Sequence, residues 1–259
     1  MLRWGCSAVA VMTLLSVAGC AHVSDWTPTR SSSDRSIAIV DGGLGSSRKV
    51  ESSVTSSWTV PGLPSEPVDG HADLLAAVIG KLGDGAPSLL DVRVATPGRP
   101  ATPDSIAQGV DWAVGRGADV VLIALSSRSD SAALRHALRD AGRNGVLVLS
   151  SMRNELVGSS SFPADHESVL SVSSVDEALA RAATSPRDGD VSAIGVGVDL
   201  GGGRVVSGTS IAAASAAAAV VRCAQSSASR SDLIRDAQRR GLRDDRGVPV
   251  LRCTERNNQ

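Results

Sequence analysis

The feature that most constrains this chain is an alternation of apolar, β-branched runs with segments of helical periodicity. The apolar runs are predicted strands and occupy residues 36–40, 89–94, 119–125, 145–150 and 168–175. Between them, apolar residues recur at helical spacing over 71–82, 103–116 and 129–143. Continuous apolar strands that alternate with helices indicate a parallel sheet covered on both faces. The sequence therefore predicts an α/β fold with a doubly wound, mostly parallel sheet flanked by helices.

The composition narrows the classes of ligand that such a domain can bind. The 259 residues include 26 Lys or Arg and 27 Asp or Glu, for a net charge of −1. This balance lacks the basic excess that neutralises phosphates, so no nucleic-acid partner is expected. Aromatic residues make up only 2% of the chain, which argues against stacking platforms for bases. No CxxC pair suggests zinc, and Asp188 and Asp190 are interpreted as a solvated turn and not as a calcium loop. No metal and no cofactor are expected.

The N-terminal residues have the shape of an export signal. Arg3 precedes an uncharged apolar stretch over residues 5–19, which is short for a spanning helix of about 20 residues. The stretch ends in the sequence VAGC at residues 17–20. This ending resembles the lipobox of bacterial lipoproteins, in which cleavage leaves a cysteine that carries lipid. An ordinary secretion signal and a retained anchor are the alternatives.

The lipoprotein interpretation divides the chain into three parts. Residues 1–19 are the expected signal peptide, and Cys20 with the polar residues up to 35 is the expected lipidated, flexible tether. Residues 36–259 form a single domain. The protein would be exported and anchored to the outer face of the bacterial cytoplasmic membrane through the lipid on Cys20.

The cysteine count is consistent with export. Cys6 would leave with the signal and Cys20 would be lipidated, so that Cys223 and Cys253 remain as an even pair. In an oxidising compartment such a pair is expected to form a disulfide, which would tie down the C-terminal tail. Two buried thiols are the alternative.

Four polar residues lie where catalytic groups are expected in such a fold. Asp41 directly follows the first apolar run, and Asn154 follows the run at 145–150. His71 opens a predicted helix, and Ser210 lies at a Gly-Thr turn before an Ala-rich helix. Sites in open parallel sheets lie beyond the carboxyl ends of the strands. Taken singly, each residue also has a structural explanation as a turn residue, a helix cap or a satisfied histidine.

The order and surroundings of these residues resemble the subtilisin-like serine proteases, the subtilases. Asp, His and Ser follow one another in the order typical of that family. The resemblance lies in six segments: AIVDGG at 38–43, GHADLLAAVIG at 70–80, SIAQGVDWAVGRGADVVLIALS at 105–126, NGVLVLSSMRN at 144–154, FPADHESVLSVSSVDE at 162–177 and SGTSIAAA at 207–214. They extend over about residues 36–224 and imply a subtilisin-like fold.

The resemblance also implies a role for each candidate residue. Ser210 would be the nucleophile, His71 its general base, and Asp41 the carboxylate that fixes the imidazole tautomer. Asn154 would donate its side-chain amide to the oxyanion, together with the backbone N–H of Ser210. The implied activity is that of a serine endopeptidase.

The same resemblance implies where a peptide or protein substrate binds. Ala124, Leu125 and Ser126 would offer backbone groups to an extended peptide. One wall of the pocket for the residue before the scissile bond would be formed by Ser150, Ser151 and Met152.

Several positions depart from the family's pattern. Ala72 and Asp73 replace the Gly-Thr pair that follows the histidine, and Arg153 replaces the glycine before the asparagine. Ser126 also stands where the family prefers glycine. A carboxylate at position 73 would favour the protonated imidazole if it lay close to His71. These departures leave a second hypothesis, a subtilase-fold pseudoenzyme lipoprotein that binds a peptide or a partner protein.

Overall fold

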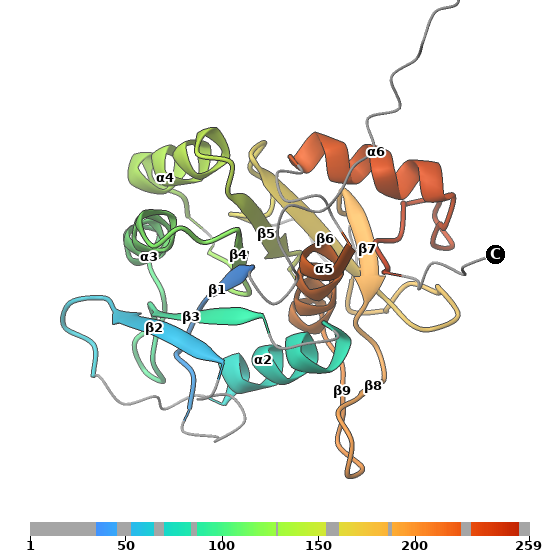
Figure 1. Cartoon of the computed structure of the whole chain (residues 1–259), viewed down its shortest axis with the longest axis horizontal. Coiled ribbons are helices and arrows are strands. Elements are labelled where there is room, and N and C mark those ends of the chain that lie inside the picture. The colour runs from blue at the N-terminus through green and yellow to red at the C-terminus, as the bar shows by residue number, and fades with distance from the viewer. Residues whose placement is uncertain are drawn as a thin grey trace, which may run out of the picture.

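A parallel sheet lies at the centre of the computed structural model, which describes residues 35–45, 53–64, 70–83, 87–127, 129–153, 161–185, 188–223 and 229–253. The sheet has seven strands in the order β2-β3-β1-β4-β5-β6-β7, and every neighbouring pair is parallel (Figure 1). The strands are β1 (Ser36–Asp41), β2 (Val54–Thr59), β3 (Ser88–Arg93), β4 (Val120–Ile123), β5 (Leu147–Ser151), β6 (Val169–Val175) and β7 (Val191–Ile194). A small antiparallel hairpin, β8 (Val198–Asp199) and β9 (Val205–Val206), projects from the body of the molecule.

Helices cover both faces of this sheet. They are α2 (His71–Leu82), α3 (Pro103–Gly115), α4 (Ala132–Arg143), α5 (Thr209–Cys223) and α6 (Arg230–Arg240). One core cluster joins α3 and α4 to one face, and a second joins α2, α5 and α6 to the other. The predicted doubly wound α/β fold is confirmed.

The alternation of side chains along β1 explains why apolar helix surfaces pack on both faces of the sheet. Ile37 and Ile39 are buried in the cluster with α2 and α5, whereas Ala38 and Val40 are buried with α3 and α4. Successive side chains of a strand point to opposite faces, so a strand covered on both sides contains consecutive apolar residues. Asp41 is the next odd-numbered residue and belongs to the face of α2 and α5.

The predicted helices form with small differences at their ends. The segment 71–82 is helical over its whole predicted length, and the helix predicted over 103–116 ends at Gly115. The helix predicted from residue 129 begins at Ala132, because the Ser131 side chain accepts the Leu134 N–H as an N-cap. The strands β2 and β7 and the helix α6 were not predicted.

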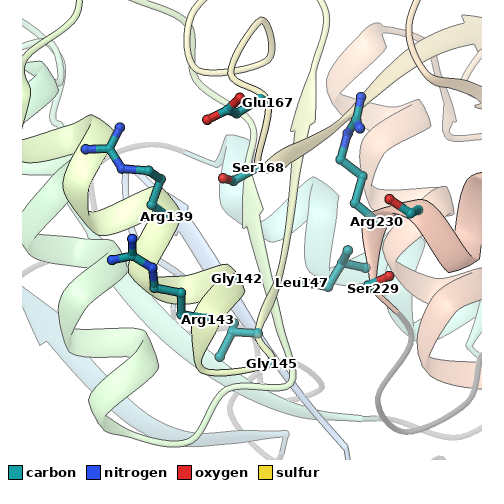
Figure 2. Close-up of a pocket in the computed structure, with 11 residues that line it drawn as sticks. Arg139, Gly142, Arg143, Gly145, Leu147, Glu167, Ser168, Ser229 and Arg230 are labelled. Carbon is teal, nitrogen blue, oxygen red and sulfur yellow. The ribbon is translucent and has the colours of Figure 1, made fainter.

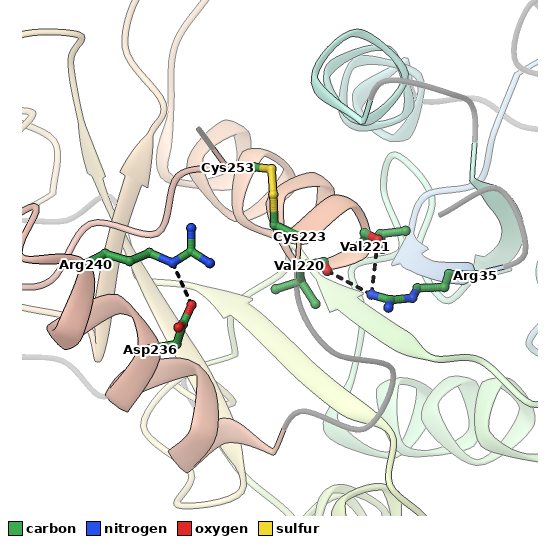
Figure 3. The surroundings of a disulfide bond; sticks show 7 residues. All are labelled: Arg35, Val220, Val221, Cys223, Asp236, Arg240 and Cys253. Atoms are coloured by element: carbon green, nitrogen blue, oxygen red, sulfur yellow. Dashed lines mark hydrogen bonds and ion pairs between the residues drawn. A yellow bond between two sulfur atoms is a disulfide. The ribbon is translucent and has the colours of Figure 1, made fainter. Parts of the chain in front are cut away.

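The C-terminal tail is tied to α5 by the predicted disulfide between Cys223 and Cys253, whose Cα atoms are 5.8 Å apart (Figure 3). Arg35, at the end of the expected flexible tether, is buried, and its guanidinium donates to the carbonyls of Val220 and Val221 at 3.2 and 3.1 Å. The ordered domain therefore includes Arg35. Residues 1–34, with the predicted signal peptide and Cys20, lie outside the described part of the chain. Among the described helices, none has the length and apolar character needed to cross a membrane.

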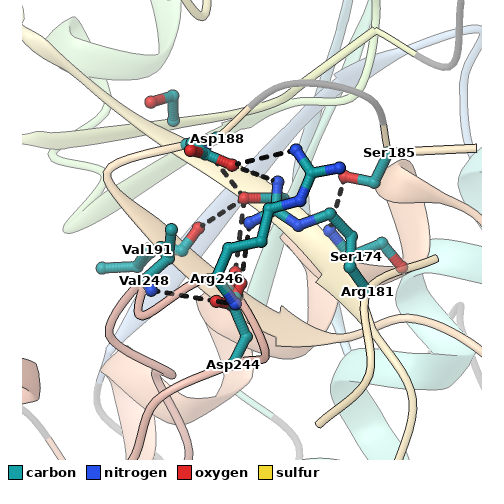
Figure 4. Close-up of polar contacts among 12 residues, drawn as sticks. Ser174, Arg181, Ser185, Asp188, Val191, Asp244, Arg246 and Val248 are labelled. Atoms are coloured by element: carbon teal, nitrogen blue, oxygen red, sulfur yellow. Dashed lines mark hydrogen bonds and ion pairs between the residues drawn. The ribbon is translucent and has the colours of Figure 1, made fainter. Parts of the chain in front are cut away.

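The segment with Asp188 and Asp190, interpreted as a solvated turn, also forms ion pairs, and the Asp188 side chain is 55% exposed. Asp188 pairs with the buried Arg181 at 2.6 Å (Figure 4). Asp190 pairs with Arg230 and accepts both the backbone N–H and the hydroxyl of Ser171 at 2.9 Å. Their charges stabilise the packing of the C-terminal segments against the sheet.

Candidate active site

Three of the four predicted catalytic residues meet at the carboxyl edge of the sheet. Asp41 is the last residue of β1, His71 is the first residue of α2, and Ser210 is the second residue of α5. The His71 Nδ1 atom lies 3.0 Å from Asp41 Oδ2, and its Nε2 atom lies 3.0 Å from Ser210 Oγ. His71 is 30 positions from Asp41 and 139 positions from Ser210 in the sequence, yet the three side chains form one continuous hydrogen-bonded line.

The surroundings of Asp41 determine the tautomer of His71. Asp41 is buried, and its Oδ1 atom accepts the N–H of Gly42 at 2.7 Å, which leaves Oδ2 to face the imidazole. A carboxylate only accepts, so Nδ1 of a neutral His71 carries the proton and Nε2 presents a lone pair to Ser210. The His71 side chain is 32% exposed, so a substrate can reach the hydroxyl beside it.

A closely packed turn places Ser210 at the start of α5. Gly208 donates its N–H to the carbonyl of Gly195 at 2.8 Å, and Ala212 donates to the carbonyl of Gly208 at 3.1 Å. A Cβ atom on Gly195 would lie only 2.6 Å from both the Gly208 oxygen and the Ala212 Cβ. Because Ser210 is in the first turn, its N–H lacks an intrahelical carbonyl partner and is free to bind an anion there.

The predicted oxyanion donor, Asn154, lies outside the described residues. The chain leads toward it from β5, and the Arg153 N–H donates to the Ser161 hydroxyl at 2.7 Å. The role of Asn154 stays a prediction.

The predicted substrate-binding residues lie at the same edge of the sheet. Ala124, Leu125 and Ser126 directly follow β4, and the chain then pairs with Phe162 through the Ser127 N–H at 2.8 Å. Ser150 and Ser151 end β5 and are buried, as is Met152, whose N–H donates to the Val172 carbonyl at 3.0 Å. Their positions are consistent with the predicted roles, which stay predictions.

A cavity of about 450 Å³ lies at the opposite edge of the sheet (Figure 2). It is lined by the end of α4, the first residue of β5, the residues before β6 and the start of α6. Two of its arginines are already neutralised, since Arg143 pairs with Asp140 and Arg230 pairs with Asp190. This cavity lies at the amino ends of the strands and is not part of the predicted site.

The sequence analysis missed an ion pair beside the site, Asp91 and Arg93 on β3. Both residues are buried, and Arg93 lies opposite Asp41 in the register of the two strands. Their charges within the apolar run LLDVRV were a signal that could have found them, because buried charges are rare and need partners.

The Subtilase family model matches residues 36–240 of the chain. The chain is 31% identical over 173 residues to Subtilisin Savinase of Lederbergia lenta, a match that covers 63% of this chain and 64% of that protein. It has the same identity to an alkaline protease of Shouchella clausii, where the match covers 45% of the relative. The chain thus spans less than two thirds of the length of these relatives.

Solved structures show the same fold. The crystal structure of a cold-adapted subtilisin-like serine proteinase superposes with a TM-score of 0.73 at 20% identity and covers 89% of this chain and 92% of its own. The crystal structure of a lanthipeptide protease gives a TM-score of 0.70 at 17% identity, with 86% of each chain covered.

Proposed function

Because this chain belongs to the subtilase family, we propose that it is a serine endopeptidase that cleaves peptide bonds with Asp41, His71 and Ser210. The observation that carries the proposal is the pair of 3.0 Å contacts that His71 makes with Asp41 and Ser210. Such contacts lie within the range in which a base accepts the proton of a nucleophile.

Each of the three side chains has one task in the proposed reaction. The Ser210 oxygen attacks the scissile carbonyl carbon while His71 Nε2 takes the hydroxyl proton, and His71 then gives this proton to the leaving amine. Water releases the acyl group from Ser210 by the same proton transfers in reverse. Asp41 stays ionised and stabilises the imidazolium that forms in each step.

The oxyanion of the tetrahedral intermediate would bind at the N-terminus of α5. The N–H of Ser210 supplies one donor there, and we assign the second to the Asn154 side chain. Donors that are fixed in advance stabilise developing charge without reorganisation, and the loss of one costs about 3 kcal/mol of transition-state stabilisation. An extended peptide would lie along Ala124, Leu125 and Ser126.

Turnover of an unstructured protein such as casein tests this proposal. The wild-type protein is expected to cleave casein, and Ser210→Ala is expected to lower kcat by about 10⁴-fold or more because no other group can form the acyl intermediate. A folded wild-type protein that binds casein without cleaving it would contradict the proposal and favour a pseudoenzyme.

We also propose that the protein is a lipoprotein, on the basis of the VAGC sequence at 17–20 after an apolar stretch. Cys20 would carry the lipid and hold the domain at the outer face of the bacterial cytoplasmic membrane. Incorporation of labelled palmitate into the wild type, and its loss in Cys20→Ala, is the expected result. Equal incorporation in both proteins, or none in either, would contradict it.

A further inference from the structure

The loop that follows Asp41 is held by three different carboxylates. Gly42 donates its N–H to Asp41 itself at 2.7 Å, and Leu44 donates to Asp91 Oδ1 at 3.0 Å. Gly45 donates to Asp73 Oδ1 at 2.8 Å. The segment 42–45, which we call the Asp41 loop, is thereby fixed to its own strand, to β3 and to α2.

Asp91 occupies an unfavourable position for a carboxylate. It lies on the same face of β3 as Leu89, which belongs to the apolar cluster under α2 and α5. Burial raises the pKa of Asp91, and the charges of Asp73 and Asp41 raise it further, while the Leu44 N–H and Arg93 lower it. Arg93 Nη2 lies 3.7 Å from Asp91 Oδ2. A charged carboxylate at a buried position destabilises the folded protein unless hydrogen bonds or ion pairs compensate for its loss of water.

The loop backbone is in close contact with these charged side chains. Gly43 has a φ of 97°, and a Cβ at this residue would overlap the Arg93 guanidinium. A Cβ on Gly45 would lie 2.5 Å from the Asp73 carboxylate. Glycine allows the backbone to come this near, and the carboxylates then receive its N–H groups.

The contacts of the Asp41 loop determine where the carboxylate of Asp41 lies. The Gly42 N–H binds Oδ1 of Asp41 and so directs Oδ2 to His71. The position of Gly42 is fixed in turn by the hydrogen bonds that Leu44 donates to Asp91 and Gly45 donates to Asp73. We propose that Asp91 is a positioning residue of the triad, which acts with Asp73 through the Asp41 loop to hold Asp41 against His71. This inference rests on the proposed function.

The groups of the triad and its surroundings come from several elements of the described structure. Asp41 contacts His71 from β1, and Ser210 contacts it from α5. Asp73, on the same helix as His71, accepts the Gly45 N–H, while Asp91 and Arg93 on β3 pair with each other.

Two substitutions separate the hydrogen bond of Asp91 from its charge. Asp91→Ala removes the acceptor of the Leu44 N–H, whereas Asp91→Asn keeps an oxygen there and removes only the charge. For Asp91→Ala we expect kcat to fall about tenfold or more with KM changed less than about threefold, since small misplacements in a triad are costly. For Asp91→Asn we expect most of kcat to return, because the Leu44 N–H keeps an oxygen acceptor.

Asp119→Ala is the matched control. Like Asp91, Asp119 accepts a backbone N–H, but its donor is Ser36 at the first residue of β1, at 2.8 Å and at the end opposite the Asp41 loop. This variant is expected to lose stability and to keep the wild-type kcat. A loss of kcat in Asp119→Ala as large as that in Asp91→Ala would show a general effect of folding and overturn the assignment.

A proton NMR signal tests positioning even if the protein has no turnover. The Nδ1 proton of His71, identified by its absence in His71→Gln, is expected to appear at low field because of its bond to Asp41. It should shift or disappear in Asp91→Ala and stay in Asp91→Asn and Asp119→Ala. If Asp91→Ala leaves both this signal and any kcat unchanged, the positioning role is wrong. A wild type without turnover, in which the signal responds as expected, would contradict only the proposed function.

Discussion

Gly195 shows how a single residue without a side chain can be essential to the site. A Cβ there would lie 2.5 Å from the Ser174 hydroxyl and 2.6 Å from the carbonyl of Gly208, two residues before the nucleophile. Neither the backbone nor the buried Ser174 can yield without moving the turn that leads to Ser210. The glycine therefore preserves the line from Ser210 to His71.

Gly195→Ala is expected to lower the free energy of unfolding by about 1–3 kcal/mol, as in overpacked cores, and to reduce kcat. Gly80→Ala is the control, because Gly80 lies within α2 with nothing within 4 Å of the added Cβ. That variant is expected to stabilise the protein by about 0.5–1 kcal/mol. Urea denaturation measures both values, and equal effects of the two variants would contradict the packing argument.

His166 gives a pH dependence that is independent of the triad. Burial, more than any other effect, lowers its pKa below the usual value of 6.5, and its Nδ1 atom accepts the Ser168 N–H at 3.1 Å. The neutral form is therefore favoured in the folded state. As the pH falls below about 6.5, the unfolded chain binds a proton more readily, and stability decreases.

His166→Asn keeps an acceptor and removes the titration, so the free energy of unfolding should fall less steeply between about pH 7 and pH 5 than in the wild type. Urea titrations at several pH values measure both slopes. Identical slopes would contradict the assignment of a neutral, buried His166.

The sequence pointed to Asp41, His71 and Ser210, which the structure brings together, but it did not point to Asp91, and the reason is physical. Asp41, His71 and Ser210 stand at the ends of strongly patterned segments, and a resemblance in sequence covers each of them. Asp91 and Arg93 are two residues apart on β3, but the contact of Asp91 with the Leu44 N–H exists only because β3 lies beside β1. No local pattern records such a contact, although the charge within an apolar run does indicate an unusual site.

Among the helices and strands, a clear pattern of apolar residues determined which elements could be predicted from the sequence. The helix α4 has a clear apolar stripe, formed by Leu134, Ala137, Leu138 and Ala141, and was predicted. The helix α6 consists mostly of charged and polar residues and buries only Leu233 and Ala237, so few apolar residues mark its buried face. The strands β2 and β7 were missed because serines interrupt their apolar residues, as the sequences VTSSWT and VSAI show.

The C-terminal segment after α6 is held by a buried carboxylate, not by an apolar stripe. Asp244 accepts the Ser192 hydroxyl at 2.7 Å, the Arg181 guanidinium at 2.8 Å and the N–H groups of Arg246 and Val248 at 2.9 Å. Burial raises the pKa of Asp244, but these hydrogen bonds outweigh it and hold the pKa below the usual 3.8. The stability from this network is present above about pH 4 and is lost as the pH falls through the folded-state pKa.

Asp244→Ala is expected to cost about 3 kcal/mol or more in the free energy of unfolding, because it leaves the buried Arg181 with a weaker partner. Asp236→Ala is the control, since the pairs of Asp236 with Arg239 and Arg240 lie at the surface of α6 and contribute about 0–1 kcal/mol. Thermal and urea denaturation give both values. Similar losses for the two variants would show that the Asp244 network adds no more than a surface pair.

At the scale of the whole molecule, α5 connects the site to both ends of the domain. Ser210 lies at its first turn, while Arg35 and the disulfide of Cys223 bind its last turn. A helix of 15 residues is about 22 Å long, so the chain enters the domain at the end opposite the nucleophile. With the lipid anchor that we propose, this arrangement separates the triad from the membrane.

The disulfide closes a loop that contains the whole of α6. Replacement of both Cys223 and Cys253 by Ser is expected to lower the free energy of unfolding by about 3–4 kcal/mol, from the entropy of a loop with a sequence separation of 30. The triad should keep its geometry at temperatures below the new transition, so the initial rate of casein cleavage should stay near that of the wild type. Loss of cleavage in the folded double variant would show that the tail supports the site directly.

The proposed function requires that His71 activates Ser210 in the folded protein. Labelling by a fluorophosphonate, with the modified residue located by mass spectrometry, tests this most directly because the reaction needs an activated serine and no particular peptide. Labelling at Ser210 is expected in the wild type, with a far slower reaction in His71→Ala and none in Ser210→Ala. A well-folded wild type that stays unlabelled, or labelling at another serine, would contradict it.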